Sequence, residues 1–451
     1  MKYLLKYVLL PGLFLSISCQ SDDVAKVYNE GTNEYTNQWM YQQMKKYYYW
    51  NENIPGEGNL SINSKEYFAG LLISTDRFSY AVQPSLPDTF AKSMRSTYGF
   101  DITFAEYEGI IYGVVIYVLS GSPAYNSGIK RGHLIKAVNG TRLNQENYKE
   151  LYGNLINNGQ GQLQVVQYSA ATGFSIPAEV SISQGFSFSQ PILHRVIIEG
   201  GNKTGYIQIP HFDVGLAQTL LDVFQEFKSQ SVNNIVVDLR YNGGGDVSSA
   251  TALSIILAPT AQPEDLFITF KGNRNGGDIS QSFQEALTMN EFQVSFRSLR
   301  NVHPAIHKIY ILCGSHTASA SEIIINNLKP FMDVLTIGDK TIGKDVAGFA
   351  IEDDRLAEQQ GWILYPSIYK LFNANNEGNY AAGITPDVQM NELQNLEVLP
   401  LGNPGEVLLK KALNTISGNG RILNSTNIKI LPGSNIYADA DPFLQFNPQF
   451  H

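Results

Sequence analysis

Two residues of the chain, Ser319 and Lys344, could together hydrolyse a peptide bond without a histidine. A serine hydroxyl is a weak nucleophile at neutral pH and needs a base to remove its proton. A lysine amine is a base only when neutral, and burial among apolar groups favours the neutral form. Lys344 lies among Ile, Val, Ala and Gly residues, which predicts such a setting. Asp345 is adjacent and would oppose it, unless its side chain points away.

Ser319 is placed where a nucleophile would be accessible. It follows the apolar run 307–313, which predicts a buried strand, and begins a helical pattern over 319–331. This order predicts a side chain at the carboxyl edge of a sheet, where α/β proteins bind ligands. The helix N-terminus would also stabilise developing negative charge. Taken alone, however, Ser319 followed by Glu322 favours a capping box, which is a purely structural device.

Glycines that follow a second buried strand, over 234–240, are candidates for an oxyanion-binding backbone. Glycine lets the backbone approach a substrate carbonyl without a Cβ clash. We therefore expect the N–H of Ala320 and one N–H from Gly244 or Gly245 to form an oxyanion hole. Loss of one such donor typically lowers the rate by a factor of about 10²–10³.

The composition is that of a globular protein with several domains. The chain has 451 residues, 43% of them hydrophobic, and a formal net charge of −9, which argues against broad attraction to nucleic acid. From residue 190 onward strands and helices alternate, which predicts a sheet flanked by helices. We expect an α+β multidomain protein with a helical N-terminal domain over 36–93, an α/β domain over 190–399 and a peripheral C-terminal tail over 400–451.

Residues 95–185 resemble a PDZ domain. The resemblance rests on the order of strands, a Ser-Pro-Ala segment at 122–124 and a Val-Asn-Gly turn at 138–140, whereas His133 stands where the family usually has Asp. It implies a loop that binds the C-terminal carboxylate of a peptide through backbone N–H groups. The matching residues are Tyr98, Gly99 and Phe100. A plain strand start would explain the same three residues.

Four segments resemble the C-terminal processing (tail-specific) peptidase family. They are Asp-Leu-Arg-Tyr-Asn-Gly-Gly-Gly at 238–245, Thr-Ala-Ser-Ala-Ser-Glu at 317–322, Thr-Ile-Gly-Lys at 341–344 and Gly-Ile-Thr-Pro-Asp at 383–387. The resemblance, over about residues 95–390, implies a crotonase/ClpP-like serine protease domain with an embedded PDZ domain. It also implies polypeptide cleavage through an acyl-enzyme, with no metal or organic cofactor. The implied roles are Ser319 as nucleophile, Lys344 as general base and Ser321 as the less favoured serine.

Two departures from that family concern the mechanism. Members often have a glutamine four residues after the lysine, where it orients the dyad, but this chain has Gly348. Gly243 also replaces a common proline in the glycine motif. The group that holds Lys344 in place must therefore come from elsewhere in the chain.

The N-terminus has the layout of a bacterial lipoprotein signal. Lys2 and Lys6 precede or flank an apolar stretch over 7–17, and Leu-Ser-Ile-Ser-Cys, ending at Cys19, resembles a lipobox. We expect a signal peptide over 1–18, lipidation of Cys19 and a polar tether over 19–35. A cleaved signal with an incidental cysteine is the alternative. The expected location is the cell envelope, anchored by lipid to the outer membrane on its periplasmic or outer face.

Other interpretations stay open. A catalytically silent relative could use its PDZ-like domain and cleft as a peptide receptor, which the missing glutamine motivates. An acyl-transfer or acyl-thioester enzyme of the crotonase type is disfavoured by the dyad and the PDZ-like insertion. A serine–histidine pair with His316 is disfavoured because a side chain one turn earlier reaches the nucleophile poorly. Cys313 lies in an apolar run, which predicts a buried thiol without a disulfide.

Overall fold

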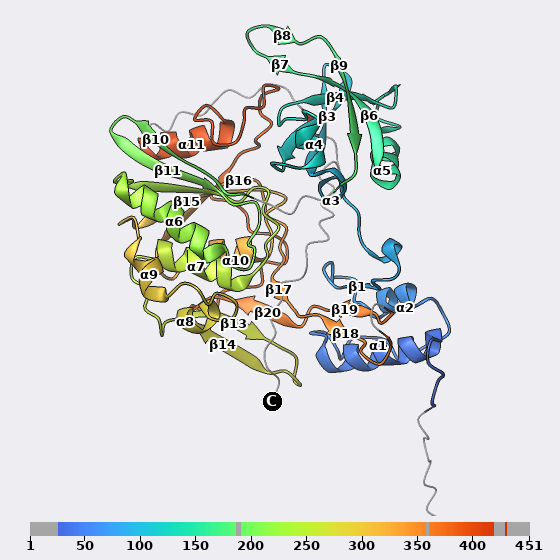
Figure 1. Cartoon of the computed structure of the whole chain (residues 1–451). Helices are drawn as coiled ribbons and strands as arrows, with labels where there is room; N and C mark the ends of the chain where they lie inside the picture. The colour runs from blue at the N-terminus through green and yellow to red at the C-terminus, as the bar shows by residue number, and fades with distance from the viewer. Residues whose placement is uncertain (1–25, 186–190, 358–359, 419–428, 431–451) are drawn as a thin grey trace, which may run out of the picture.

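The computed structural model describes residues 26–185, 191–357, 360–418 and 429–430, which form an α+β protein of three domains (Figure 1). We call residues 26–93 the N-terminal domain, 94–185 the middle domain and 191–418 the C-terminal domain. The lipidation candidate Cys19 and the expected signal peptide lie outside the described residues. Within the described ranges, no helix is long and apolar enough to cross a membrane.

The C-terminal domain is built on a six-stranded sheet with the order β10-β11-β12-β15-β16-β21. The β10–β11 pair is antiparallel and the other pairs are parallel. The strands are β10 (Leu193–Glu199), β11 (Asn202–Gln208), β12 (Asn234–Asp238), β15 (Lys308–Cys313), β16 (Asp333–Gly338) and β21 (Val388–Gln389). The predicted alternation of strands and helices is therefore present, because the buried runs that form β12 and β15 are too apolar for either face to be solvated.

Helices cover both faces of this sheet. One face carries α6 (Leu216–Ser229), α7 (Val247–Leu257), α8 (Phe283–Leu287), α9 (Phe296–Asn301) and α10 (Ala320–Asn327). The other carries α11 (Val407–Ile416), whose apolar residues pack on Tyr206, Val236 and Leu312 (Figure 1). The expectation that 400–451 is a peripheral tail is therefore wrong for its first part. The pattern of Val407, Leu408 and Leu413 is that of an amphipathic helix, which the surrounding Asn, Pro and Gly residues obscured.

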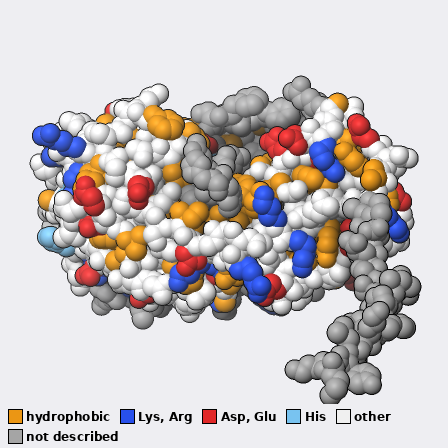
Figure 2. Space-filling model, turned by 90° about the horizontal axis from the view of Figure 1, so that it is seen from below, with side chains coloured by type: hydrophobic (Ala, Val, Ile, Leu, Met, Phe, Trp, Pro, Cys, Tyr) orange, Lys and Arg blue, Asp and Glu red, His pale blue; other side chains and the backbone are white. Residues whose placement is uncertain are grey.

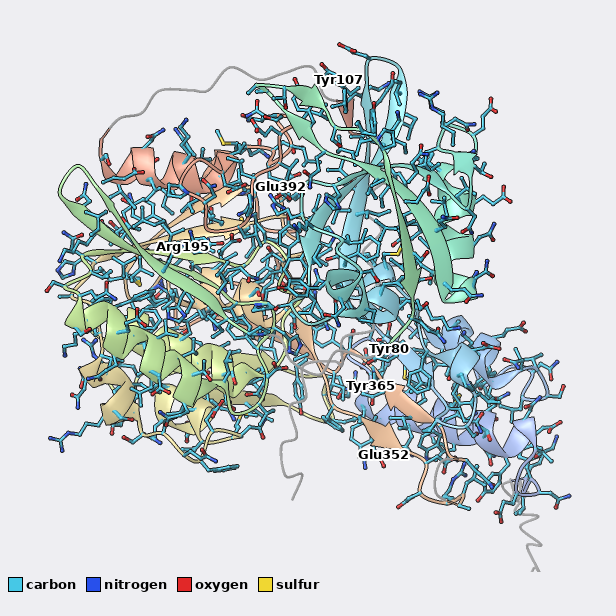
Figure 3. The ribbon with its side chains drawn as sticks, turned by 45° about the horizontal axis from the view of Figure 1, so that its top comes forward. Tyr80, Tyr107, Arg195, Glu352, Tyr365 and Glu392 are labelled. Atoms are coloured by element: carbon cyan, nitrogen blue, oxygen red, sulfur yellow. The ribbon has the colours of Figure 1, made fainter. Side chains whose placement is uncertain are left out.

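The C-terminal domain contains a second, four-stranded sheet, and a separate three-stranded sheet joins this domain to the N-terminal domain. The order β14-β13-β20-β17 comprises β13 (Leu266–Lys271), β14 (Asp278–Ser282), β17 (Val346–Ala347) and β20 (Tyr369–Phe372). Next to it β18 (Ile351–Glu352) and β19 (Ile363–Tyr365) pair with β1 (Tyr80–Val82) of the N-terminal domain, where Tyr80 stacks on Tyr365 at 4.6 Å (Figure 3). The other N-terminal elements are α1 (Asn33–Tyr47), α2 (Ser64–Leu71) and a 3-10 turn over Pro87–Thr89.

The middle domain contains a mainly antiparallel sheet with the order β22-β2-β3-β4-β6-β9. Its strands are β2 (Phe100–Tyr107), β3 (Ile110–Val118), β4 (Leu134–Val138), β5 (Thr141–Arg142), β6 (Gln160–Val166) and β9 (Ala178–Ser183), with a β7–β8 hairpin (Tyr168–Ser169, Gly173–Phe174). Helices α3 (Met94–Tyr98), α4 (Pro123–Asn126) and α5 (Tyr148–Asn158) complete it. The strand β22 (Lys429–Ile430) comes from the far C-terminal part of the chain.

Acidic, basic and apolar side chains are interspersed on the face shown in Figure 2. Cys313, at the end of β15, is free and buried, and burial raises the pKa of its thiol.

Candidate active site

Ser319 has an unusual backbone conformation at the carboxyl edge of the six-stranded sheet. It lies between β15 and α10, with φ 59° and ψ −120°. Such a conformation in a non-glycine residue costs of the order of 1–3 kcal/mol and is typical of active sites. The Ser319 side chain is buried, and its Oγ has no hydrogen-bond partner among the residues that the structure describes. A strained serine with an unengaged hydroxyl is better suited to react than to cap a helix.

Hydrogen bonds to the segment that follows β12 hold the turn before Ser319. Thr317 donates its hydroxyl to the Leu239 carbonyl at 2.8 Å, and Ala318 N–H donates to the Asn242 carbonyl at 3.2 Å. The Ser321 hydroxyl also donates to the Asn242 carbonyl, at 3.1 Å. The second serine of the motif is therefore engaged in positioning the turn, in contrast to Ser319.

The glycine loop packs directly against Ser319. Gly244 and Gly245 have φ values of +120° and +123°. A Cβ on Gly244 would lie 2.6 Å from the Ser319 Cβ and 3.1 Å from the Ala320 nitrogen, so only glycine fits there. Gly244 N–H donates to Asn242 Oδ1 at 2.8 Å, which occupies that donor. For the N–H groups of Gly245 and Ala320, we find no hydrogen bond within the described part of the chain.

Glu322 connects the Ser319 segment to the Lys344 segment. Its Oε2 accepts Ser319 N–H at 2.9 Å and Lys344 N–H at 2.7 Å. Its Oε1 accepts Gly343 N–H at 2.7 Å and the Thr341 hydroxyl at 2.5 Å. One carboxylate thus fixes the backbone of both candidate dyad residues, and it does so from the third position of α10.

The Glu322 carboxyl is almost completely buried, and its protonation is finely balanced. Burial raises its pKa to about 7, although the four donated hydrogen bonds act in the opposite direction. All four partners present hydrogens to the carboxylate, so only the ionised form accepts every bond. Protonation places a fifth hydrogen at a site that already faces four donors.

Lys344 is half-buried, and the charge of its neighbour is compensated. Both Asp345 carboxylate oxygens lie 2.7 Å from Lys370 Nζ, so the Asp345 side chain is committed to another lysine. The Lys344 segment is further held by the N-terminal domain: the Arg77 guanidinium donates to the Ile342 carbonyl at 2.8 Å and to the Ala381 carbonyl at 2.9 Å.

Sequence reasoning did not identify Glu322, Arg77 or Tyr380 as functional residues. Glu322 was interpreted only as a helix cap, although its place three residues after Ser319 was a usable signal. Arg77 gave no signal, because it is remote in sequence from the segment it holds. The hydroxyl of Tyr380 is buried without a hydrogen-bond partner among the described residues, and burial, with Glu322 and Asp345 nearby, raises its pKa.

The candidate peptide-binding loop lies in the middle domain, at the junction of α3 and β2. Gly99 has φ +83°, and a Cβ there would lie 2.1 Å from the Ser122 Cβ, so this position requires glycine. The side chains of Tyr98 and Phe100 are buried in the domain core, and the Tyr98 hydroxyl donates to the Leu155 carbonyl at 2.6 Å. Only the backbone of this loop is therefore in a position to meet a ligand.

A buried charge network joins the middle domain to the glycine loop. Arg240 donates to Asp238 at 2.7 Å and to Glu406 at 2.7 Å, and Glu392 accepts from both Arg240 and Arg131 (Figure 3). The adjacent Tyr241 is contacted twice from the middle domain. Arg95 donates to its carbonyl at 2.7 Å, and the guanidinium of Arg131 donates to its hydroxyl. Movement of the middle domain would therefore act on the backbone next to Gly243–Gly245.

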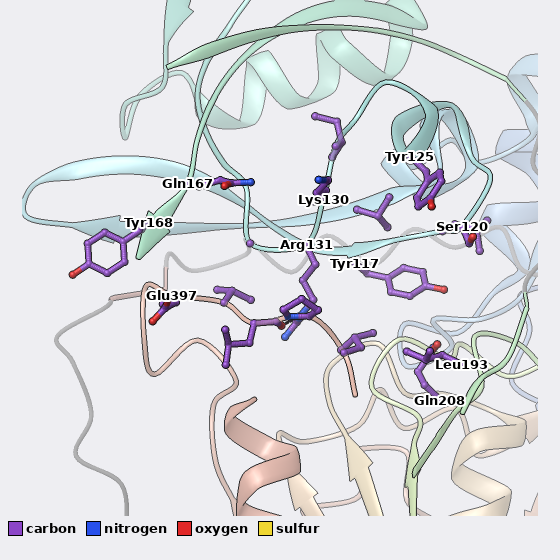
Figure 4. Close-up of a pocket in the computed structure, with 18 of the residues that line it drawn as sticks. Tyr117, Ser120, Tyr125, Lys130, Arg131, Gln167, Tyr168, Leu193, Gln208 and Glu397 are labelled. Atoms are coloured by element: carbon purple, nitrogen blue, oxygen red, sulfur yellow. Dashed lines mark hydrogen bonds between the residues drawn. The ribbon is translucent and has the colours of Figure 1, made fainter. Parts of the chain in front are cut away.

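A cavity of about 810 Å³ lies between the middle and C-terminal domains (Figure 4). Tyr117, Ile129 and Arg131 line one side, and Leu193 and Gln208 line the other. Neither Ser319 nor Lys344 is among its lining residues, so it is not the site of the candidate chemistry. Among the described residues, no group of three or more His, Cys, Asp or Glu is arranged to hold a metal ion.

A sheet flanked by helices, with a strained serine at a helix N-terminus beside a glycine loop, defines the class of hydrolases that act through an activated serine. Family comparison gives the particular family. The model "Peptidase family S41" matches residues 203–390, and "Peptidase S41 N-terminal domain" matches residues 35–80. The chain belongs to peptidase family S41, which confirms the family suspected from the four motifs.

Individual relatives agree with this assignment. The chain is 22% identical over 310 residues to the carboxyl-terminal-processing protease of Synechocystis, covering 68% of this chain and 66% of that protein. It is 26% identical over 327 residues to the carboxy-terminal processing protease CtpA of Bacillus subtilis, covering 70% and 63%. Both matches span slightly less than two thirds of the relatives' lengths. A crystal structure of a Bacteroides fragilis protein assigned to the S41 proteases superposes with TM-score 0.68 and 27% identity, covering 87% of this chain and 98% of that one.

Proposed function

We propose that this protein is a serine endopeptidase that cleaves polypeptides with Ser319 as nucleophile and Lys344 as general base. One observation carries the proposal beyond family membership: Oε2 of Glu322 accepts both Ser319 N–H and Lys344 N–H, while Ser319 Oγ has no partner among the described residues. The serine is thus kept unengaged next to the segment that supplies the lysine.

The proposed reaction proceeds through an acyl-enzyme intermediate. Neutral Lys344 accepts the Ser319 proton as Oγ attacks the scissile carbonyl carbon. The resulting oxyanion receives hydrogen bonds from Gly245 N–H and Ala320 N–H, and the N-terminus of α10 stabilises its charge. Lys344 then returns the proton to the leaving amine. Water, deprotonated by the same lysine, hydrolyses the acyl-enzyme and restores Ser319.

We assign the middle domain a PDZ-like role in this reaction, and the C-terminal domain a crotonase/ClpP-like core. The backbone of Tyr98–Phe100 would bind substrate, and the contacts of Arg95 and Arg131 with Tyr241 would relay that event to the glycine loop. Lipidation of Cys19 would keep the enzyme at the cell envelope. The alternative, a catalytically silent peptide receptor, is motivated by Gly348.

The test is cleavage of an unfolded polypeptide such as casein by the purified chain. Ser319→Ala and Lys344→Met should each abolish turnover while the circular dichroism spectrum and thermal midpoint stay close to those of the unmodified protein. Retained turnover in Ser319→Ala would overturn the assignment. A folded, unmodified protein that binds casein without cleaving it would favour the silent receptor.

A further inference from the structure

The far C-terminal part of the chain adds a strand to the edge of the middle domain's sheet. In the order β22-β2-β3-β4-β6-β9, β22 lies next to β2, which would otherwise be an edge strand. The pairing is antiparallel, with Glu106 opposite Lys429 and Ala105 opposite Ile430. Lys429 Nζ also lies 3.7 Å from Glu106 Oε2. Tyr107, labelled in Figure 3, marks the end of β2 at which this contact is made.

The direction of β22 is informative. Because the pair is antiparallel, β22 runs opposite to β2, so its carboxyl end faces the Phe100 end of β2, where the candidate carboxylate-binding loop lies. An edge strand presents unpaired N–H and C=O groups to which an extended peptide can add. Lys429 and Ile430 therefore pair with Ala105 and Glu106 of β2 in the orientation of a peptide ligand whose carboxyl end faces the Tyr98–Phe100 loop.

We propose that the segment around Lys429–Ile430 is an intramolecular ligand of β2 that must be displaced before another polypeptide can bind there. The inference deepens the proposed function, since it rests on β2 being the substrate-binding edge. It makes the tail a built-in competitor of the substrate, carried by the same chain.

The strength of this competition follows from the covalent tether. Helix α11 ends at Ile416 and β22 begins at Lys429, so the linker between them is short. A short linker gives the tethered segment an effective concentration in the millimolar range at β2. The described contact is small: it pairs two residues, and the Lys429 side chain is 71% exposed. A contact of this size is weak enough to be displaced. If it holds β2 for half to nine tenths of the time, the affinity for an added peptide falls about two- to tenfold.

Binding can be measured apart from catalysis in a Ser319→Ala background. The full chain is compared with a variant that ends at Gly418, which keeps α11 intact. The probe is a fluorescein-labelled synthetic peptide with the sequence of residues 424–437 of this chain, followed by fluorescence anisotropy. The shortened variant should bind the probe two- to tenfold more tightly than the full chain. Its β2 amides should also exchange hydrogen faster in the absence of the probe.

Two matched variants test whether backbone pairing is responsible. A Lys429→Pro, Ile430→Pro double variant should behave like the shortened chain, because proline cannot donate to the ladder. The Lys429→Ala, Ile430→Ala double variant keeps every backbone donor and should stay within about twofold of the full chain. Protection of β2 should not depend on protein concentration. Concentration-dependent protection would assign the contact to a second copy and overturn the proposal.

Equal exchange of β2 and equal probe affinity in the full and shortened chains would also overturn it. That outcome is distinct from failure of the proposed function, which is decided by casein turnover in the chain with Ser319 intact. A catalytically silent protein can still show tail displacement, and an active peptidase can lack it.

Discussion

Glu322→Gln is the sharpest test of how the two candidate dyad segments are held together. Glutamine has nearly the same shape as glutamate, but one carboxylate oxygen becomes an N–H₂ group that cannot accept hydrogen bonds. In the better orientation its oxygen still accepts Ser319 N–H and Lys344 N–H, and its nitrogen faces Gly343 N–H and the Thr341 hydroxyl. Thr341 can rotate its hydroxyl and accept, but Gly343 N–H is left buried and unpaired.

An unpaired buried N–H costs about 1–3 kcal/mol. If this cost falls on the geometry of the reacting groups, kcat/KM decreases by a factor of about 10–100, since each 1.36 kcal/mol changes a rate tenfold. The assay is hydrolysis of a fluorogenic peptide from pH 5 to pH 9, with urea unfolding of the same samples. A loss of stability alone would leave kcat/KM unchanged at temperatures where both proteins are folded.

The pH profile separates positioning from simple destabilisation. Protonation of Glu322 disrupts the four-donor arrangement, so activity of the unmodified protein should decrease as the pH falls through about 7. Stability should change in the opposite direction. Because the pKa of this carboxyl is raised on folding, its contribution to stability is fully present below about pH 4.5 and is lost as the pH rises through about 7. In Glu322→Gln the stability dependence and the part of the activity loss that Glu322 causes near pH 7 should disappear, whereas protonation of the general base Lys344 still lowers activity at acid pH.

The matched control is Glu291→Gln. Glu291 is also a buried glutamate, and it accepts Gly215 N–H at 2.9 Å, Ala217 N–H at 3.2 Å and the Ser249 hydroxyl at 2.7 Å. All three bonds reach the same oxygen, which glutamine keeps, so this change should leave no donor unpaired and should leave the pH profile of kcat/KM unchanged. If Glu322→Gln keeps full activity, or keeps the same loss of activity near pH 7, then Glu322 does not position the dyad.

Three further substitutions test the surroundings of the site. Gly244→Ala should lower kcat/KM at least 100-fold, because its Cβ would lie 2.6 Å from the Ser319 Cβ; peptide hydrolysis by the folded variant measures this. Arg77→Ala should lower kcat about tenfold, with KM nearly unchanged, because the Ile342 carbonyl loses its donor; steady-state kinetics checks the split. Lys370→Met should reduce the free energy of unfolding by about 3–5 kcal/mol in urea, since it leaves the buried Asp345 carboxylate unpaired.

The placement of Ser319 could be predicted because it depends on local sequence. In the sequence an apolar strand is followed by a short turn and then by a helix, and the structure contains β15 and α10 at those positions. The positive φ of Ser319 could not be predicted, since its neighbours Thr317 and Ser321 are held by Leu239 and Asn242, which belong to the distant segment after β12. Glu322 illustrates an intermediate case: its helical position was evident, but its bonds to Gly343 and Lys344 depend on how a distant segment packs.

Sequence patterns did not predict the contacts between domains. The role of Arg77 depends on the packing of the N-terminal domain beside residues 341–344, and periodicity carries no information about that packing. The same holds for β22, which is only two residues long and gives no strand signal in the sequence. Its partner β2, by contrast, lies in the segment 95–185, whose order of strands was recognised from the sequence.

These interdomain contacts converge on the two backbone segments that the proposed chemistry needs. Arg77 of the N-terminal domain holds the loop before Lys344 through the Ile342 carbonyl, while Arg95 of the middle domain holds the Tyr241 carbonyl before the glycine loop. Each arginine belongs to a different domain from the segment it contacts, so the contact is lost if the domain that carries the arginine moves. A peptide that shifts the middle domain would therefore change the oxyanion loop without touching Ser319, and displacement of β22 from β2 is the step at which such a shift would begin.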